Sequence, residues 1–92
     1  MNKYETVMII QKDMDDMQEV ISKFTNLINL NGKVTRIDDM GVRNLAYSIA
    51  GNKQGYYVVV EFEAKEKFIP ELERNYRITN AILKFIVVKQ NN

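Results

Sequence analysis

Two segments of alternating apolar residues constrain the fold of this chain more than any other feature. The first reads GVRNLAYSI (residues 41–49), and the second reads GYYVVVEF (residues 55–62). Alternation with a period of two is typical of half-buried β-strands. The residues between the two segments are rich in Gly, Asn and Lys, so we expect a β-hairpin whose turn is formed by residues 51–55.

The strands extend beyond this hairpin. The first hairpin strand is expected to run from residue 33 to residue 50, with a bulge at Gly41 that resets the alternation. Residues 3–10 and 83–89 alternate in the same way and are predicted to be the first and last strands. Residues 90–92 are expected to form a frayed end.

Two helices are predicted between these strands. Apolar residues recur at helical spacing after an acidic segment, in which Asp13 or Asp15 is expected to cap the first helix. The pair Asn31-Gly32 should end that helix, since both residues tolerate the left-handed conformation of a helix C-terminus. The second helix is expected over residues 65–76. Its Pro70 is tolerated only near the first turn, which predicts a late start or a slight kink.

The element order βαββαβ, with two amphipathic helices, is that of a ferredoxin-like α+β sandwich. We expect residues 1–92 to form a single domain. Both helices would cover one face of a four-stranded antiparallel sheet, and the right-handed crossover rule gives the strand order 4-1-3-2. The second strand then lies at an exposed edge of the sheet.

The two helices can cover only one face of such a sheet. On that face we expect a single core that includes Tyr4, Met8, Ile28, Leu45, Tyr47, Val58, Val60, Leu72, Phe85 and Val87. The open face would carry Val7, Ile9, Tyr57, Val59, Ile86 and Val88. An uncovered apolar face indicates a contact surface, but scattered apolar residues are also common on open antiparallel sheets. Both interpretations stay open.

Composition argues against catalysis. The chain has no Cys and no His, which excludes a Cys/His metal site, a thiol nucleophile and a histidine general base. The acid pairs Asp15-Asp16 and Asp38-Asp39 lack the ligand spacing of a calcium loop, and the scattered glycines do not form a phosphate-binding loop. We expect no enzymatic activity, no metal, no cofactor and no small-molecule substrate.

Nothing in the sequence predicts membrane insertion. The longest apolar run, residues 56–60, is far too short to cross a bilayer. The N-terminus reaches charged residues at once and has no signal-peptide core. We therefore expect a cytoplasmic protein that does not bind membranes.

The net charge is only +1, but the basic residues are unevenly distributed. Residues 74–92 carry four basic side chains and no acidic one, which is either solvated surface or the footprint of an anionic partner. RNA-recognition modules of this fold stack bases on aromatic residues of the third strand. Here the alternation leaves Tyr57 alone on the open face, which is a poor platform for stacking. Any RNA binding should therefore use backbone contacts and a helper.

Several segments resemble the family of the sixth protein of the bacterial small ribosomal subunit. The block DMGVRNLAY (residues 39–47) is similar to the most characteristic block of that family, and YETVMI (residues 4–9) is similar to its first strand. The segment YRITNAILK (residues 76–84) resembles its passage into the last strand, and VVK (residues 87–89) resembles its close. The resemblance covers essentially the whole chain in the same order.

The resemblance implies a structural protein of the cytoplasmic ribosome. Members of this family form a heterodimer with the eighteenth small-subunit ribosomal protein. They bind the central domain of 16S ribosomal RNA, on the platform of the small subunit. The family often has proline where this chain has Ser48, and a basic residue where it has Asn44. The second difference argues against an RNA contact at that position.

Two sets of site residues follow from this interpretation. The partner protein would bind the edge of the second strand, because an edge strand presents unpaired backbone groups. The expected interface residues are Arg36, Met40, Val42, Arg43 and Leu45. The RNA phosphates would contact basic residues near the other strands, namely Lys3, Lys53, Arg77, Lys84 and Lys89.

A second class of function stays open. The chain could be a small-molecule-binding or self-oligomerising regulatory module on the same fold, using its open sheet face to pair with a second copy. A ligand held between sheets, or a stable homodimer that ignores RNA, would support this alternative.

Overall fold

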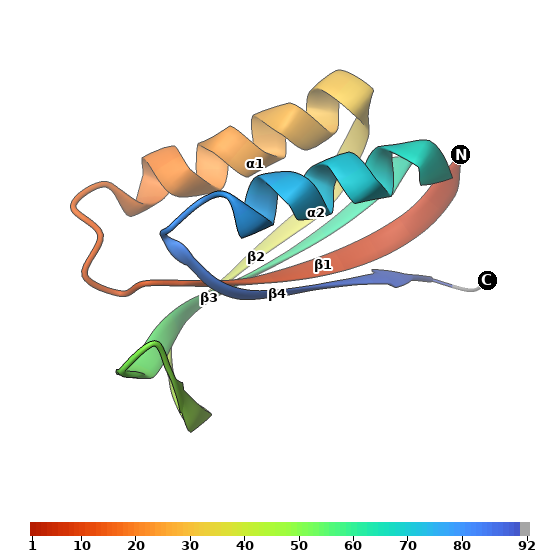
Figure 1. Ribbon diagram of the computed structural model, residues 1–92. Helices are drawn as coiled ribbons and strands as arrows, with labels where there is room; N and C mark the ends of the chain where they lie inside the picture. The colour runs from red at the N-terminus through yellow and green to blue at the C-terminus, as the bar shows by residue number, and fades with distance from the viewer. Residues whose placement is uncertain (91–92) are drawn as a thin grey trace.

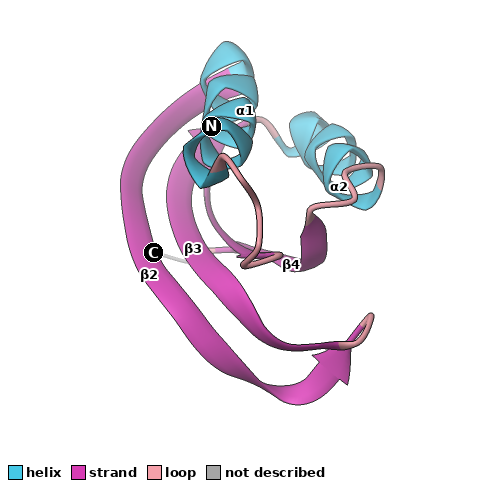
Figure 2. Ribbon diagram, turned by 90° about the vertical axis from the view of Figure 1, so that its left-hand side faces the viewer, coloured by secondary structure: helices cyan, strands magenta, loops and turns pink. Residues whose placement is uncertain are grey.

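The computed structural model describes residues 1–90 and has two layers, a sheet and a pair of helices (Figure 1). Its elements are β1 (Asn2–Ile10), α1 (Met17–Asn31), β2 (Gly32–Ile49), β3 (Asn52–Ala64), the 3-10 helix η1 (Glu66–Phe68), α2 (Ile69–Arg77) and β4 (Ile82–Lys89). The four strands form one antiparallel sheet in the order β2-β3-β1-β4. Both helices lie on the same face of it (Figure 2). The predicted ferredoxin-like architecture and strand order are confirmed.

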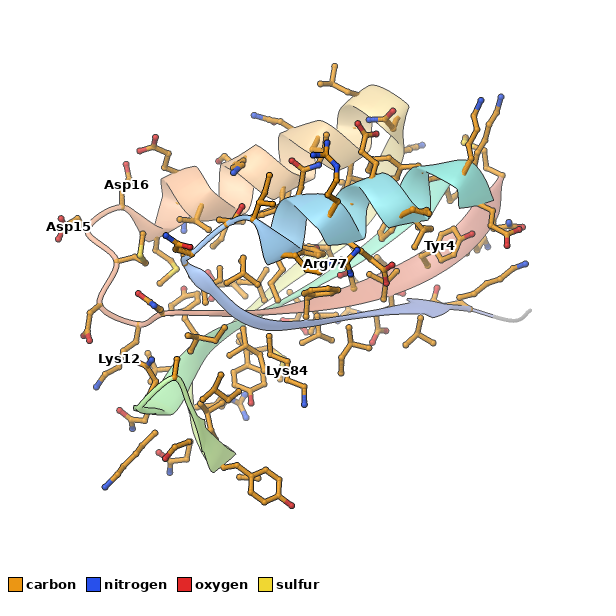
Figure 3. The ribbon with its side chains drawn as sticks, in the orientation of Figure 1. Tyr4, Lys12, Asp15, Asp16, Arg77 and Lys84 are labelled. Carbon is orange, nitrogen blue, oxygen red and sulfur yellow. The ribbon has the colours of Figure 1, made fainter. Side chains whose placement is uncertain are left out.

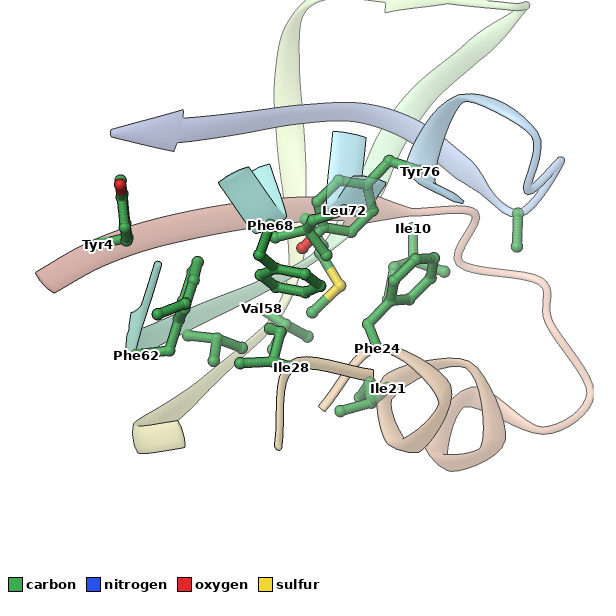
Figure 4. Packing of buried hydrophobic residues seen from close by; sticks show 14 residues of the cluster. Tyr4, Ile10, Ile21, Phe24, Ile28, Val58, Phe62, Phe68, Leu72 and Tyr76 are labelled. Atoms are coloured by element: carbon green, nitrogen blue, oxygen red, sulfur yellow. The ribbon is translucent and has the colours of Figure 1, made fainter. Parts of the chain in front are cut away.

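The core lies between the helices and the two central strands (Figure 4). β1 and β3 pair directly, so that alternate residues of both strands face the helices together. The buried residues of these strands on the helical face are Tyr4, Thr6, Met8, Ile10, Val58, Val60, Phe62 and Ala64. Those on the helical segments include Ile21, Phe24, Ile28, Phe68, Leu72 and Tyr76. The apolar stripes of both helices therefore close over one continuous core.

Tyr76 connects α2 to both layers of this core. Its ring lies 4.6 Å from the ring of Phe24 on α1 and 5.0 Å from that of Phe85 on β4, measured between centroids. Its hydroxyl is 3.0 Å from Thr6 Oγ1, which donates its own proton to the carbonyl of Ile86. The Tyr76 hydroxyl must therefore donate to Thr6, and both buried hydroxyls are satisfied.

The β2–β3 hairpin extends beyond the helices and curls beneath the open face of the sheet (Figure 2). Its turn is tighter than expected. Ile49 pairs with Asn52, which leaves only Ala50 and Gly51 between the strands. Both have positive φ, 49° and 80°, as a two-residue type I′ turn requires. Residues 52–55, predicted to belong to the turn, are instead part of β3.

The predicted bulge at Gly41 is confirmed. The register with β3 shifts between Asp39 and Gly41, and Gly41 has a φ of 74°. Two further register shifts lie between Val34 and Arg36 and between Asn44 and Ile49. Bulges increase the local twist of a strand and bend it, which accounts for the curl of this long hairpin.

Because of this curl, the prediction that Tyr47 and Leu45 belong to the core is wrong. Tyr47 is 85% exposed, and Leu45 is half-buried in a groove on the open face. Both lie on the part of the hairpin that extends past the helices, where nothing is available to bury them on the helical side. The remaining core predictions are confirmed: Tyr4, Met8, Ile28, Val58, Val60 and Leu72 are buried, and Phe85 and Val87 are half-buried against the same cluster.

The ends of α1 differ from expectation in two details. The cap is Asp16 rather than Asp13 or Asp15, and its Oδ1 accepts a hydrogen bond from the Glu19 N–H at 3.1 Å. Gly32 ends the helix with a φ of −174°, so it is extended rather than left-handed. Glycine is needed there because a Cβ would collide with the Glu63 carbonyl on β3.

The second helix begins late, as predicted. The 3-10 turn η1 precedes α2, and Pro70 occupies its first turn, where the missing N–H has no intrahelical partner. The predicted frayed end is wrong for Gln90, whose N–H donates to the Lys3 carbonyl at 2.8 Å. The other two residues of that prediction lie outside the described part of the chain. Within that part, no helix has the length and apolar character needed to cross a membrane.

Replacing Val60 by Ala should destabilise the fold by about 2–4 kcal/mol, because the fully buried side chain leaves a cavity between sheet and helices. The measurement is urea unfolding of the isolated chain. Val42→Ala is the matched control, since Val42 is 48% exposed and should change stability by less than about 0.5 kcal/mol. Equal effects of the two substitutions would contradict this assignment of the core.

Replacing Tyr76 by Phe should reduce the loss of stability at alkaline pH. Burial raises the pKa of the Tyr76 phenol far above its ordinary 10.0. The unfolded chain therefore loses this proton first. The stabilising contribution is complete below pH 10.0 and is lost above it at about 1.4 kcal/mol per pH unit.

Urea unfolding of the parent and Tyr76→Phe chains at several pH values above 9 would measure this difference. Tyr47→Phe is the control, since that phenol is exposed and should leave the parent's pH dependence unchanged. Parallel stability curves for the parent and Tyr76→Phe would rule out the buried phenol as the cause.

Candidate partner and nucleic-acid interfaces

β2 forms a long free edge of the sheet. It pairs with β3 on one side only, so within residues 1–90 the backbone N–H and C=O groups of its outer side have no strand to pair with. Of the predicted interface residues, Arg36, Met40, Val42 and Arg43 are exposed, with Met40 37% and Val42 48% exposed. The other edge, β4, has only 8 residues against the 18 of β2.

The bulge in this edge is held by the carboxylate of Asp39. The Tyr56 hydroxyl donates to it, lying 2.6 and 2.7 Å from its two oxygens, and the Gly41 N–H donates to Oδ1 at 3.2 Å. The hydrogen bond to Asp39 is also the main cause of a raised pKa at Tyr56. Asp39 and Gly41 pair with successive residues of β3, which leaves Met40 as the unpaired residue of the bulge. An apolar side chain is thereby placed at the exposed edge.

Arg36 is engaged in a charged network on the open face. Its guanidinium lies 3.5 Å from Glu61 and 3.7 Å from Asp38. Glu61 is directly opposite Glu5 on the neighbouring strand, and like charges in that position repel. The Gln90 side-chain amide donates to both carboxylates, at 3.3 and 3.5 Å. This end of the open face is therefore rich in carboxylates.

A groove lies at the opposite end of the open face, beneath the curled hairpin. Its volume is about 310 Å³, and its lining includes Ile9, Leu45, Ile49, Tyr57, Tyr47 and Lys84. Leu45, predicted as a residue of the β2 edge, thus turns into the groove instead. Gly55 allows the close packing of its floor, since a Cβ there would collide with Ile9.

The five basic residues predicted to bind RNA are all exposed but do not form one patch. Lys84 points away from the helices, on the side of the hairpin (Figure 3). Lys53 lies on β3, in the hairpin itself. Arg77 is at the end of α2, with its guanidinium 5.9 Å from the Phe85 ring. Lys3 and Lys89 lie toward the other end of the sheet.

Sequence reasoning missed Lys12. Its Nζ is 3.0 Å from Gln54 Oε1 on β3, which adds a further basic residue to the hairpin end of the molecule. The pairing of the strands could have indicated this contact, because Lys12 follows the end of β1 by two positions and that end pairs with the start of β3. Alternation along single strands does not reveal such a contact between loop and hairpin.

An acidic cluster surrounds the start of α1. Asp13, Asp15, Asp16 and Glu19 border a shallow cavity of about 580 Å³ with Met14 and Lys23. Asp16 serves as the helix cap, which agrees with a structural role for these acids. Over residues 1–90, no group of His, Cys, Asp and Glu side chains is arranged to hold a metal ion.

Comparison with known proteins gives a consistent result. Residues 3–89 match the family described as ribosomal protein S6. The small ribosomal subunit protein bS6 of Helicobacter hepaticus is 45% identical, over 97% of this chain and 67% of its own length. That of Thermoanaerobacter pseudethanolicus is 38% identical, over 97% of both chains.

A solved structure shares the fold. The crystal structure of 30S ribosomal protein S6 from Thermotoga maritima superimposes with a TM-score of 0.92 at 26% identity, covering 97% of this chain and 87% of that one. The family match spans the elements from β1 to β4, including the hairpin block by which the sequence resembled this family. The chain therefore belongs to the ribosomal protein S6 family of the small ribosomal subunit.

Proposed function

We propose that this chain is a structural, non-catalytic constituent of the small ribosomal subunit that binds the central domain of 16S ribosomal RNA, on the platform, as a heterodimer with the eighteenth small-subunit protein. The match of residues 3–89 to the ribosomal protein S6 family carries this proposal, because it covers nearly the whole described chain. The charge distribution supports the proposal that both proteins of the heterodimer contact the RNA. With a net charge of +1 and dispersed basic residues, the chain alone offers few phosphate contacts.

The geometry supports a division of the surface between the two partners. The long β2 edge offers backbone hydrogen bonds and two exposed apolar side chains, Met40 and Val42, which suit a protein segment. The basic residues Lys53, Arg77 and Lys84 lie on other elements, so RNA can reach them while the edge is occupied. The carboxylates near Arg36 favour a partner that is itself basic.

Co-purification of the tagged chain from cell extract tests the function as a whole. We expect 16S ribosomal RNA and one small basic protein to be recovered with it. A chain recovered as a homodimer without RNA would overturn the proposal and favour the self-oligomerising alternative.

Met40→Asp and Val42→Asp should each weaken the heterodimer while leaving the monomer folded. Both side chains are exposed, so the fold tolerates the charge, whereas a contact with the partner would bury it without a counter-ion. Titration calorimetry with the purified partner measures the affinity. Ile78→Asp is the matched control, since Ile78 is 63% exposed at the end of α2. Unchanged affinity in both edge variants would move the interface away from β2.

Replacing Lys3, Lys53, Arg77, Lys84 and Lys89 together by Ala should weaken the RNA complex of the heterodimer. Each lost phosphate contact should lower the slope of log affinity against log salt by roughly 0.7 to 0.9. The control removes three exposed lysines, Lys33, Lys65 and Lys67, so an effect of net charge alone would change its slope by about three-fifths as much. Affinity and slope equal to those of the parent would refute this assignment, as would a control whose slope changes in that proportion.

A further inference from the structure

Tyr47 is the most exposed large apolar side chain of the described residues, at 85%. It lies at the far end of β2, where the hairpin has left the helices behind. Holding an aromatic ring in water forgoes the burial that normally stabilises such a residue. Exposed aromatic residues next to a groove mark binding sites. The geometry of the hairpin accounts for the exposure of Tyr47, and it leaves the ring free to contact a ligand.

The curl of the hairpin brings Tyr47 and Tyr57 to the lining of one groove. Tyr57 pairs with Ile9, whose side chain is buried in the groove floor. Ile9 packs so closely against Gly55 that a Cβ there would collide with it, and Leu45 lies within van der Waals reach of the same position. The groove volume of about 310 Å³ is at the small end of ligand pockets, which span about 300–1,000 Å³. It is a preformed apolar site with two aromatic rings.

The charges around this groove are basic. No acidic residue occurs between Asp39 and Glu61, which includes the whole curled part of the hairpin. Lys84 belongs to the lining, and Arg43 pairs with Gly55 next to the groove floor. The carboxylates of the open face, Glu5 and Glu61, gather at the other end of the sheet. The groove therefore suits a ligand with a flat apolar part and a negative charge.

We propose that the groove binds a single unpaired nucleotide of ribosomal RNA, with its base against Tyr47 and Tyr57 and a phosphate at Lys84. The inference rests on the proposed RNA-binding function and names a site for it. The nucleotide must be unpaired, because bases inside a duplex have no free face to stack on an aromatic ring. The positive charge of the groove would repel a basic protein partner, so that partner is expected at the β2 edge and near the carboxylates Glu5 and Glu61.

The test uses the heterodimer and a 16S ribosomal RNA fragment that covers the central domain. Tyr47→Ala and Tyr47→Leu should each weaken binding by about 5- to 100-fold, because both remove the aromatic ring. Tyr47→Phe retains the ring and should stay within about twofold of the parent. All three variants should keep the salt slope of the parent, since no charge changes. Lys84→Gln should lower that slope by roughly 0.7 to 0.9.

Photocrosslinking gives an independent readout. Ultraviolet irradiation of the complex followed by trypsin digestion should place a nucleotide adduct on the peptide of residues 44–53, which contains Tyr47, or on that of residues 54–65, which contains Tyr57. Tyr47→Leu should abolish the adduct on the first peptide. Adducts confined to other peptides of the parent would overturn the proposed site.

Three results separate this inference from the proposed function. If Tyr47→Ala binds RNA as the parent does while the variant lacking five basic residues is weakened, RNA binding stands and the nucleotide site is wrong. If Tyr47→Ala weakens the heterodimer in the absence of RNA, the groove belongs to the protein partner and the inference is overturned. If the parent heterodimer does not bind the RNA fragment, both proposals fail.

Discussion

The structure depends on a difference in length between the helices and the hairpin they cover. α1 has 15 residues and spans about 22 Å, whereas β2 has 18 residues and a contour of about 60 Å. The helices can therefore bury only the first part of the hairpin. The rest bends at its bulges and packs against the open face of the sheet, where Leu45 and Tyr57 join Ile9 in the groove. The free edge, the groove and the exposed Tyr47 all follow from this mismatch.

The open face carries its carboxylates at one end of the sheet, together with Arg36, and the bend of the hairpin covers the other end. Glu5 and Glu61 lie together at the end where β1 begins, with Gln90 bridging them. Lys84 lies at the end covered by the hairpin. A protein with little net charge can bind both a basic protein and an anionic nucleic acid when its charges are sorted in this way. The Asp39 carboxylate has a structural role instead, because it accepts hydrogen bonds from the Gly41 N–H and the Tyr56 hydroxyl and so holds the bulge of the β2 edge.

Much of the fold could be predicted from local patterns. Alternation and helical periodicity placed every strand and helix, and chain connectivity with the crossover rule supplied their order. The wrong predictions concern positions at which the local sequence is compatible with more than one structure. Three aspartates stand before α1, and only the path of the loop selects Asp16 as the cap. Among the candidate interface residues, the alternation placed Leu45 on a strand but not on the face that it occupies.

What the sequence by itself determined is the set of elements, their order, the family and the buried face of the central strands. These depend on residue periodicity and on motifs, which are local properties of the chain. Only the tertiary structure decided where the distal hairpin lies. The alternation of Tyr47 with its neighbours predicts burial, but burial needs an opposing surface, and the helices end before the hairpin does. The two tyrosines of the groove lie on different strands, and only the curl of the hairpin makes them neighbours.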